Sequence, residues 1–105
     1  MSFEKLLTNI KYATQKQKDE ELWDIEGMLS KYSNQILKFD LRPLVNNTKK
    51  GSSKTKADKM VFDINNEYII VDVKELHQYI KNKKTNKVYL NNLIKELDWN
   101  IILNK

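Results

Sequence analysis

The stretch KMVFDINNEYIIVDV, residues 59–73, constrains the fold of this chain more than any other part of the sequence. Two apolar runs, MVFDI and YIIVDV, flank the polar residues Asn65, Asn66 and Glu67. Short apolar runs rich in valine, isoleucine and aromatic residues are typical of buried strands. Asparagine tolerates the positive φ angles that tight turns need, so the sequence predicts a β-hairpin here.

The chain of 105 residues is long enough for one domain with its own core, so we expect residues 1–105 to form a single domain. No segment approaches the roughly 18 uninterrupted apolar residues of a membrane helix, and charges in MSFEKLLTNI argue against a secretory signal. The sequence has no cysteine, which excludes disulfides, thiol catalysis and the usual structural zinc sites. We therefore expect a cytoplasmic (intracellular) protein without a membrane partner.

The first third of the chain has apolar residues at helical spacing. They are Phe3, Leu6, Leu7, Ile10 and Ala13, followed by Leu22, Ile25, Met28, Leu29 and Tyr32. This spacing predicts a helical N-terminal segment over about residues 2–33, either as one helix or as two with a break near 14–18. Gly27 costs about 1 kcal/mol in a helix interior relative to alanine, which indicates close packing of this position against another element.

The rest of the chain reads as short strands and helices around the hairpin. QILKFDL, residues 35–41, alternates like a strand that Pro43 should end or flank. A lysine-rich loop is expected at about residues 45–59, a helix from Glu75, and a short helix at about 90–97 before a strand that starts near Trp99. The predicted fold class is α/β (α+β): an N-terminal helical segment, a small mixed sheet with a central hairpin, and flanking helices.

The formal net charge is +5, and Arg42 is the only arginine. Lysine is a flexible point charge that suits phosphate neutralisation, whereas base reading more often uses arginine. We expect a nucleic-acid partner, with DNA favoured, and the alternative is a lysine surface kept for solubility. The candidate nucleic-acid-binding residues are Lys49, Lys50, Lys54, Lys56, Lys59, Lys81, Lys83, Lys84 and Lys87.

Two acids and a lysine sit where a hairpin would bring them together. Asp58 precedes the first apolar run, Asp72 ends the second, and Lys74 follows two residues later. Two converging carboxylates could hold Mg²⁺ through oxygen ligands, and the lysine could orient a water for attack on a phosphodiester. The candidate catalytic residues are Asp58, Asp72 and Lys74, and the candidate metal ligands are Asp58 and Asp72.

This order of elements and residues, over about residues 20–80, resembles the PD-(D/E)XK nuclease superfamily. The resemblance implies a Mg²⁺-dependent endonuclease that hydrolyses DNA, with Asp58 and Asp72 on the metal and Lys74 as the motif lysine. It also implies a supporting acid in the first helix, such as Glu21 or Glu26. By analogy with small members of the superfamily, a homodimer is an expectation.

The sequence departs from that pattern, and other interpretations stay open. Ala57 stands where the motif often has proline, Asp72 where it more often has glutamate, and Asp63 competes with Asp58 for the role of first carboxylate. Asp72 and Glu75 also have the spacing of a capping box, in which Asp72 caps a helix and Glu75 reaches back.

His77, the only histidine, is expected to be a surface residue rather than a base. Two functional alternatives need no working site. One is a non-catalytic nucleic-acid-binding module, whose lysine runs 49–59 and 81–87 need only share a face. The other is an accessory or inhibitor protein, of the kind that phages and mobile elements encode, that acts through protein contacts. The acidic residues Asp19, Glu20, Glu21 and Asp24 would suit such contacts.

Overall fold

The computed structural model describes residues 3–29, 34–43, 48–50, 55–64, 66–84, 87–89 and 94–104, with the backbone alone at 43, 48–50 and 87–89. The strands are β1 (Leu7–Tyr12), β2 (Ile25–Leu29), β3 (Leu37–Pro43), β4 (Thr48–Lys50), β5 (Lys59–Asp63), β6 (Glu67–Asp72), β7 (Lys87–Tyr89) and β8 (Asn100–Asn104). The helices include η1 (Phe3–Leu6, a 3₁₀ helix), α1 (Gln15–Glu20) and α2 (Val73–Lys83), and residues 94–96 are also helical.

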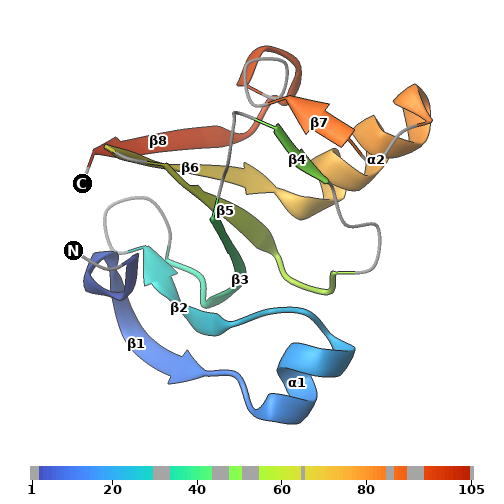
Figure 1. Cartoon of the computed structure of the whole chain (residues 1–105). Coiled ribbons are helices and arrows are strands. Elements are labelled where there is room, and N and C mark those ends of the chain that lie inside the picture. Colours follow the sequence, from blue (N-terminus) through green and yellow to red (C-terminus); the bar gives the residue numbers. More distant parts are fainter. Residues whose placement is uncertain are drawn as a thin grey trace.

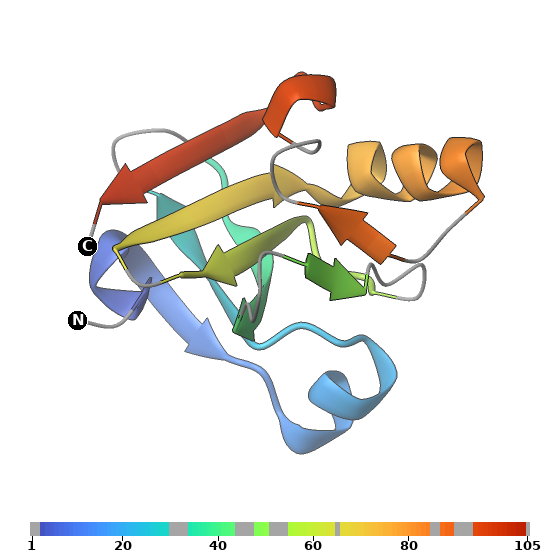
Figure 2. The same ribbon diagram turned by 45° about the horizontal axis from the view of Figure 1, so that its top comes forward.

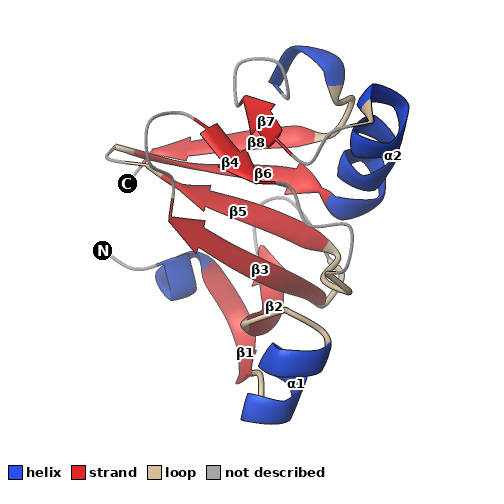
Figure 3. Ribbon diagram, turned by 45° about the vertical axis from the view of Figure 1, so that its right-hand side comes forward, coloured by secondary structure: helices blue, strands red, loops and turns tan. Residues whose placement is uncertain are grey.

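Six of the described strands form one mixed sheet in the order β1-β2-β3-β5-β6-β8, and β4 and β7 form a separate antiparallel ribbon. Within the large sheet β3 and β5 are parallel, and the other neighbours are antiparallel. Helix α2 continues from the end of β6, and α1 lies at the opposite end of the molecule (Figures 1 and 3). The predicted α+β class with a small mixed sheet is confirmed.

The predicted hairpin is present as β5 and β6. Their register runs from Lys59 opposite Asp72 to Asp63 opposite Tyr68. The amide of Ile64 donates to the carbonyl of Glu67 at 3.0 Å, and the amide of Glu67 donates back at 3.4 Å, so the loop between them has the two-residue form. Asn65 lies outside the described residues. With β3 beside β5 and β8 beside β6, the hairpin occupies the centre of the sheet.

Both faces of the hairpin are buried, because alternate side chains of each strand enter two separate cores. The first core, on the side of α2, comprises Trp23, Ala57, Met60, Phe62, Ile69, Val71, Val73, Leu76, Ile80 and Leu97. The second core comprises Phe3, Leu7, Ile25, Leu29, Phe39, Val61, Tyr68 and Ile70. Strands β1 and β2 are inclined steeply to β6 and β8, which helps the bent sheet to enclose the second core (Figure 2).

The ring of Phe3 packs against two other aromatic rings of the second core. Its centroid is 5.2 Å from that of Phe39 and 5.4 Å from that of Tyr68, in edge-to-face geometry. Aromatic pairs prefer such arrangements. The first turn of the chain therefore contributes directly to the packing of the central strands, although it forms only a short 3₁₀ helix.

The prediction of a helical segment over residues 2–33 is wrong for most of its length. Leu7–Tyr12 and Ile25–Leu29 are strands, and within the described residues of this segment helix is confined to η1 and α1. Burial in β2 alternates, with Ile25, Gly27 and Leu29 buried, which is the period of a strand. The positions 22, 25, 28 and 29 also fit helical spacing, and local spacing does not reveal that β2 pairs with both β1 and β3.

Helix α1 covers most of the residues 14–18, where a break was one of the two alternatives that the sequence left open. Thr14 and Gln17 make a complete capping box: the Thr14 hydroxyl accepts from the Gln17 amide at 3.1 Å, and the Gln17 side chain accepts from the Thr14 amide at 2.9 Å. The helix ends at Glu20, with Glu21 as its C-cap, and the next residue, Leu22, has a φ of 64°, which is unusual for a residue other than glycine. This turn redirects the chain so that the Trp23 side chain enters the first core.

The remaining segments agree with the sequence in part. The lysine-rich stretch 45–59 is not loop throughout, because it contains β4 and ends in the first residue of β5. Pro43 is the last residue of β3, as expected. Helix α2 and strand β8 are confirmed, and residues 94–96 of the predicted helix 90–97 are helical, while 90–93 lie outside the described residues. None of the helices in the described part of the chain has the length and apolar character needed to cross a bilayer.

Gly27 is needed because β1 approaches β2 closely at this position. A Cβ added there would lie 3.0 Å from the Thr8 carbonyl oxygen and 3.2 Å from the Leu7 Cβ. The close packing predicted for this glycine is confirmed, although the element is a strand.

We expect Gly27→Ala to lower the free energy of unfolding by about 1 to 3 kcal/mol, because the added methyl group would press on the β1 backbone and on Leu7, a residue of the second core. Urea denaturation would measure the loss, with Thr8→Ala on the exposed face of β1 as the matched control. Equal stability of the two variants would show that β1 can move without penalty.

Candidate functional site

One pocket of the described structure gathers the acids and the lysine singled out by the sequence. Its volume is about 200 Å³. It is lined by Gln35, Leu37, Ala57, Asp58, Lys59, Asp72 and Lys74. The sheet register explains this convergence, because β5 begins opposite the end of β6 and beside Phe39 of β3. Asp58, Asp72 and Lys74 therefore come together as predicted.

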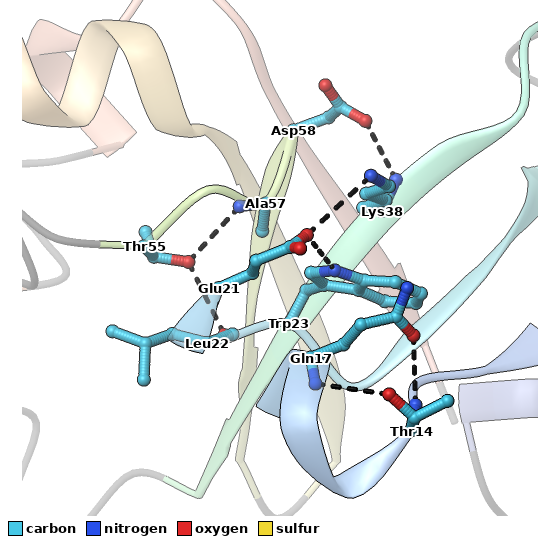
Figure 4. A network of polar contacts seen from close by, with 9 residues as sticks. All are labelled: Thr14, Gln17, Glu21, Leu22, Trp23, Lys38, Thr55, Ala57 and Asp58. Carbon is cyan, nitrogen blue, oxygen red and sulfur yellow. Dashed lines mark hydrogen bonds and ion pairs between the residues drawn. The ribbon is translucent and has the colours of Figure 1, made fainter. Parts of the chain in front are cut away.

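Asp58 joins three elements at the entrance of β5. Its Oδ2 accepts from the Lys38 amide at 2.8 Å, and its own amide donates to the Lys38 carbonyl at 2.8 Å. Its carbonyl accepts from the Val73 amide at 3.1 Å. Figure 4 shows the Asp58 carboxylate directed at the backbone of Lys38. Asp58 thus fixes the start of β5 against β3 and against the first residue of α2.

The Lys38 side chain continues this network on the other side. Its ammonium lies 3.9 Å from Glu21 Oε1 and 5.2 Å from the centroid of the Trp23 ring. Glu21 Oε1 also accepts from the Trp23 indole nitrogen at 2.9 Å (Figure 4). Thr55 closes the network, since its hydroxyl donates to the Leu22 carbonyl and accepts from the Ala57 amide.

Asp72 has two partners. As the N-cap of α2, it accepts from the Glu75 amide through Oδ2 at 3.2 Å, which confirms the predicted cap. Its Oδ1 lies 2.7 Å from the Lys59 ammonium. The Lys59 side chain is only 12% exposed and that of Asp72 is 21% exposed. The ammonium also lies 3.7 Å from the centroid of the Trp99 ring, so a carboxylate and an aromatic face share one cation.

Glu75 binds backbone amides outside α2, at Asp98 and Trp99, rather than closing the predicted capping box. Its two carboxylate oxygens accept from the amides of Asp98 and Trp99, at 2.8 and 3.0 Å. These bonds attach the first turn of α2 to the segment that leads into β8. They also hold Trp99 beside Lys59, so the cap and the cation site are built by adjacent residues.

The donor set of the pocket does not match a magnesium site as it stands. Mg²⁺ is bound through carboxylates and waters in near-octahedral geometry, whereas here Asp58 accepts from an amide and Asp72 from an ammonium and an amide. Across the described residues, no group of three or more histidine, cysteine or acidic side chains is placed to hold a metal ion. These contacts do not support a magnesium site at this pocket, and the site stays a prediction from the sequence.

The other acids considered from the sequence lie apart from the pocket. Asp63 is at the opposite end of β5, where it pairs with Tyr68. Glu26 is on β2, opposite Lys38 of β3 and Lys11 of β1. Glu21 does not belong to the pocket lining, and it binds Trp23 and Lys38 instead. His77 lies on α2, is half-exposed and does not line the pocket.

The candidate nucleic-acid-binding lysines lie in several parts of the structure. Lys49, Lys50 and Lys87 belong to the β4–β7 ribbon, and Lys81, Lys83 and Lys84 are exposed at the end of α2. Lys56 is exposed between β4 and β5, and Lys54 lies outside the described residues. Lys59 differs from the rest, because its side chain is largely buried and its ammonium contacts Asp72 and the Trp99 ring.

Sequence reasoning missed two features of this region. Arg42 forms a two-point ion pair with the buried Asp40, at 2.8 and 3.1 Å. The pairing of Lys59 with Asp72 was also missed. The ion pair of Arg42 with Asp40 could have been predicted, because residues two positions apart on a strand lie on the same face. The second follows from the hairpin register once the two-residue loop is assigned.

We expect Asp72→Ala to lower the free energy of unfolding by about 2 to 4 kcal/mol, because it removes the cap of α2 and the carboxylate partner of Lys59. Asp72→Asn keeps a capping oxygen and should lose less. Thermal or urea denaturation would compare the two with Lys74→Ala, an exposed neighbour. If Asp72→Ala were as stable as Lys74→Ala, neither interaction would stabilise the fold.

The pocket thus combines two acids and two lysines, with one acid and one lysine neutralised by each other. Lys74 lines the pocket and its side chain is exposed, so an anion from solvent can reach it. In the structure, the hydrogen bonds of Asp58 and Asp72 hold β3, β5, β6 and α2 together. Comparisons of the chain with protein-family models, with curated proteins and with solved structures found no match.

Proposed function

We propose that this protein binds the phosphate backbone of nucleic acid, with DNA favoured, through a lysine surface formed by the β4–β7 ribbon and the end of α2. This lysine surface comprises Lys49, Lys50, Lys81, Lys83, Lys84 and Lys87. The observation that carries the proposal is the pairing of β4 with β7, which sets Lys50 opposite Lys87 and Lys49 opposite Val88. Two lysine runs that are more than 30 positions apart in the sequence thereby become neighbours.

The pairing of Lys50 with Lys87 supports the proposal because two like charges at opposed positions should repel each other unless an anion lies beside them. Like charges at directly opposed positions of two strands destabilise their pairing. The lysines of α2 support the proposal less strongly, because the helix dipole already favours cations in the last turn of a helix. A phosphate lying beside Lys50 and Lys87 would replace repulsion by attraction, as lysine–phosphate contacts do in nucleic-acid complexes.

The kind of charge supports binding without sequence preference. Arg42, the only arginine of the chain, is held by the buried Asp40. The guanidinium fork suits two-point reading of guanine in the major groove, and here the fork of Arg42 is engaged by Asp40. A two-stranded ribbon is itself narrow enough to enter the major groove of duplex DNA. The protein would then hold DNA by its backbone, irrespective of sequence.

The test is fluorescence anisotropy with a labelled DNA duplex of arbitrary sequence at a series of salt concentrations. We expect the logarithm of the binding constant to fall linearly with the logarithm of salt, with a slope of about 0.9 for each phosphate neutralised. Lys50→Ala combined with Lys87→Ala should reduce that slope by up to about 1.8. A second duplex of different sequence should give the same affinity.

The matched control is Lys16→Ala combined with Lys18→Ala on α1, two exposed lysines at the far end of the molecule (Figures 1 and 3). This double variant changes the net charge by the same amount. If both double variants weakened binding equally, overall charge rather than the lysine surface would govern affinity. If the wild type bound no nucleic acid, the alternative of an accessory protein acting through protein contacts would replace the proposal.

A second candidate, a metal-dependent endonuclease, is favoured by the presence of Asp58, Asp72 and Lys74 around one pocket. Under the binding proposal, labelled duplex, branched and single-stranded DNA should stay intact with Mg²⁺ or Mn²⁺ at concentrations of protein that saturate binding. Metal-dependent cutting by the wild type that is lost in Lys74→Ala and in Asp58→Asn would instead establish the nuclease. Circular dichroism would show that both variants remain folded.

A further inference from the structure

We infer that strand β8 is an interface through which two copies of this chain pair antiparallel and extend their sheets into one. Among the described residues, β8 is one of the two outer strands of the large sheet, and it has a neighbour, β6, on one side. An outer strand offers a row of backbone donors and acceptors to any chain that can align with it. The occupant proposed here is a second β8.

The other outer strand, β1, is poorly suited to such pairing. Its register with β2 shifts between Thr8 and Lys11, and Asn9 has a φ of 55°, so the strand contains a bulge. The hydroxyl of Tyr12 is directed back to Glu4, to which it donates at 2.9 Å, and this hydrogen bond raises the pKa of Tyr12. Bulges and charged residues are devices that prevent edge-to-edge association.

Strand β8 has the opposite properties. It pairs with β6 through five consecutive positions, from Asn100 opposite Val71 to Asn104 opposite Glu67, without a shift in register. Its sequence, NIILN, contains no charged residue, proline or glycine. Ile102 is 45% exposed, and Ile101 and Leu103 are only partly buried although they pack against the second core. Three consecutive apolar side chains are thus incompletely covered.

The sequence of β8 identifies the second copy as the partner. NIILN reads as the same pattern of polar and apolar residues in both directions. Antiparallel pairing about a two-fold axis at Ile102 sets Asn100 opposite Asn104, Ile101 opposite Leu103, and Ile102 opposite itself. Every apolar residue then meets an apolar one, and every amide, which can both donate and accept, meets another amide. A slip by one residue would destroy this match.

The pairing would also continue both cores across the interface. Ile102 is opposite Ile69, a residue of the first core, so it lies on that side of the sheet. Ile101 and Leu103 lie on the side of the second core. A two-fold interface of this kind is self-complementary, as in most homodimers. A single pair of short strands is small for a stable interface, so we expect the dimer to depend on protein concentration.

The first test is sedimentation velocity from low micromolar to millimolar protein. We expect a monomer–dimer equilibrium in the wild type and a dissociation constant raised more than about tenfold in Ile102→Lys, which sets like charges against each other at the two-fold axis. Ile10→Lys is the matched control, since Ile10 is a 39% exposed isoleucine on the other outer strand. Its dimerisation should equal that of the wild type.

The second test holds even if Ile102→Lys fails to fold. The chain has no cysteine, so Ile102→Cys provides a single thiol. Opposed residues of antiparallel strands have Cα atoms about 4.5 to 5.5 Å apart, which suits a disulfide. Mild oxidation should therefore give covalent dimers much faster than with Ile36→Cys, an exposed isoleucine away from both outer strands. A wild type monomeric at all concentrations, or equal cross-linking of the two variants, would overturn the inference.

Discussion

The burial of the β5–β6 hairpin on both faces is the constraint on which the rest of the structure depends. Met60, Phe62, Ile70 and Val71 have no exposed surface, and they belong to two different cores. A hairpin with two apolar faces must be covered by other segments on each side, and its buried backbone groups need strands on both edges. Helix α2, η1 and the strands β3 and β8 meet these requirements.

This constraint also explains where the polar chemistry of the chain can lie. The middle of each central strand is fully apolar, so charged side chains are confined to the strand ends. Asp58, Lys59 and Asp72 stand at one such end, where they join β3, β5 and α2 and neutralise each other in part. The exposed lysines Lys81, Lys83 and Lys84 lie instead at the end of α2, outside the large sheet, where the Lys83 ammonium is 3.6 Å from Glu96 Oε1.

The sequence predicted the features whose residues lie close together along the chain more reliably than the others. The hairpin, the cap of α2 by Asp72 and the convergence of Asp58, Asp72 and Lys74 depend on one continuous stretch of the sequence, and the structure contains all three. The N-terminal strands could not be recognised, because apolar residues at 22, 25, 28 and 29 fit a helix, and this spacing does not reveal that β2 pairs with β1 and β3. The β4–β7 pair has no hydrophobic pattern, and Glu75 finds its partners 23 and 24 residues away.

The parallel pairing of β3 with β5 has a further consequence for the lysine-rich stretch. Parallel neighbours cannot be joined by a tight turn, so the chain must travel back along the sheet between Pro43 and Asp58. The sheet fixes the two ends of this crossover, whereas a connection between strands tolerates changes of length and sequence that a core strand does not. Natural variation or engineering could therefore retune the charge carried by this crossover while the scaffold that supports it stays the same.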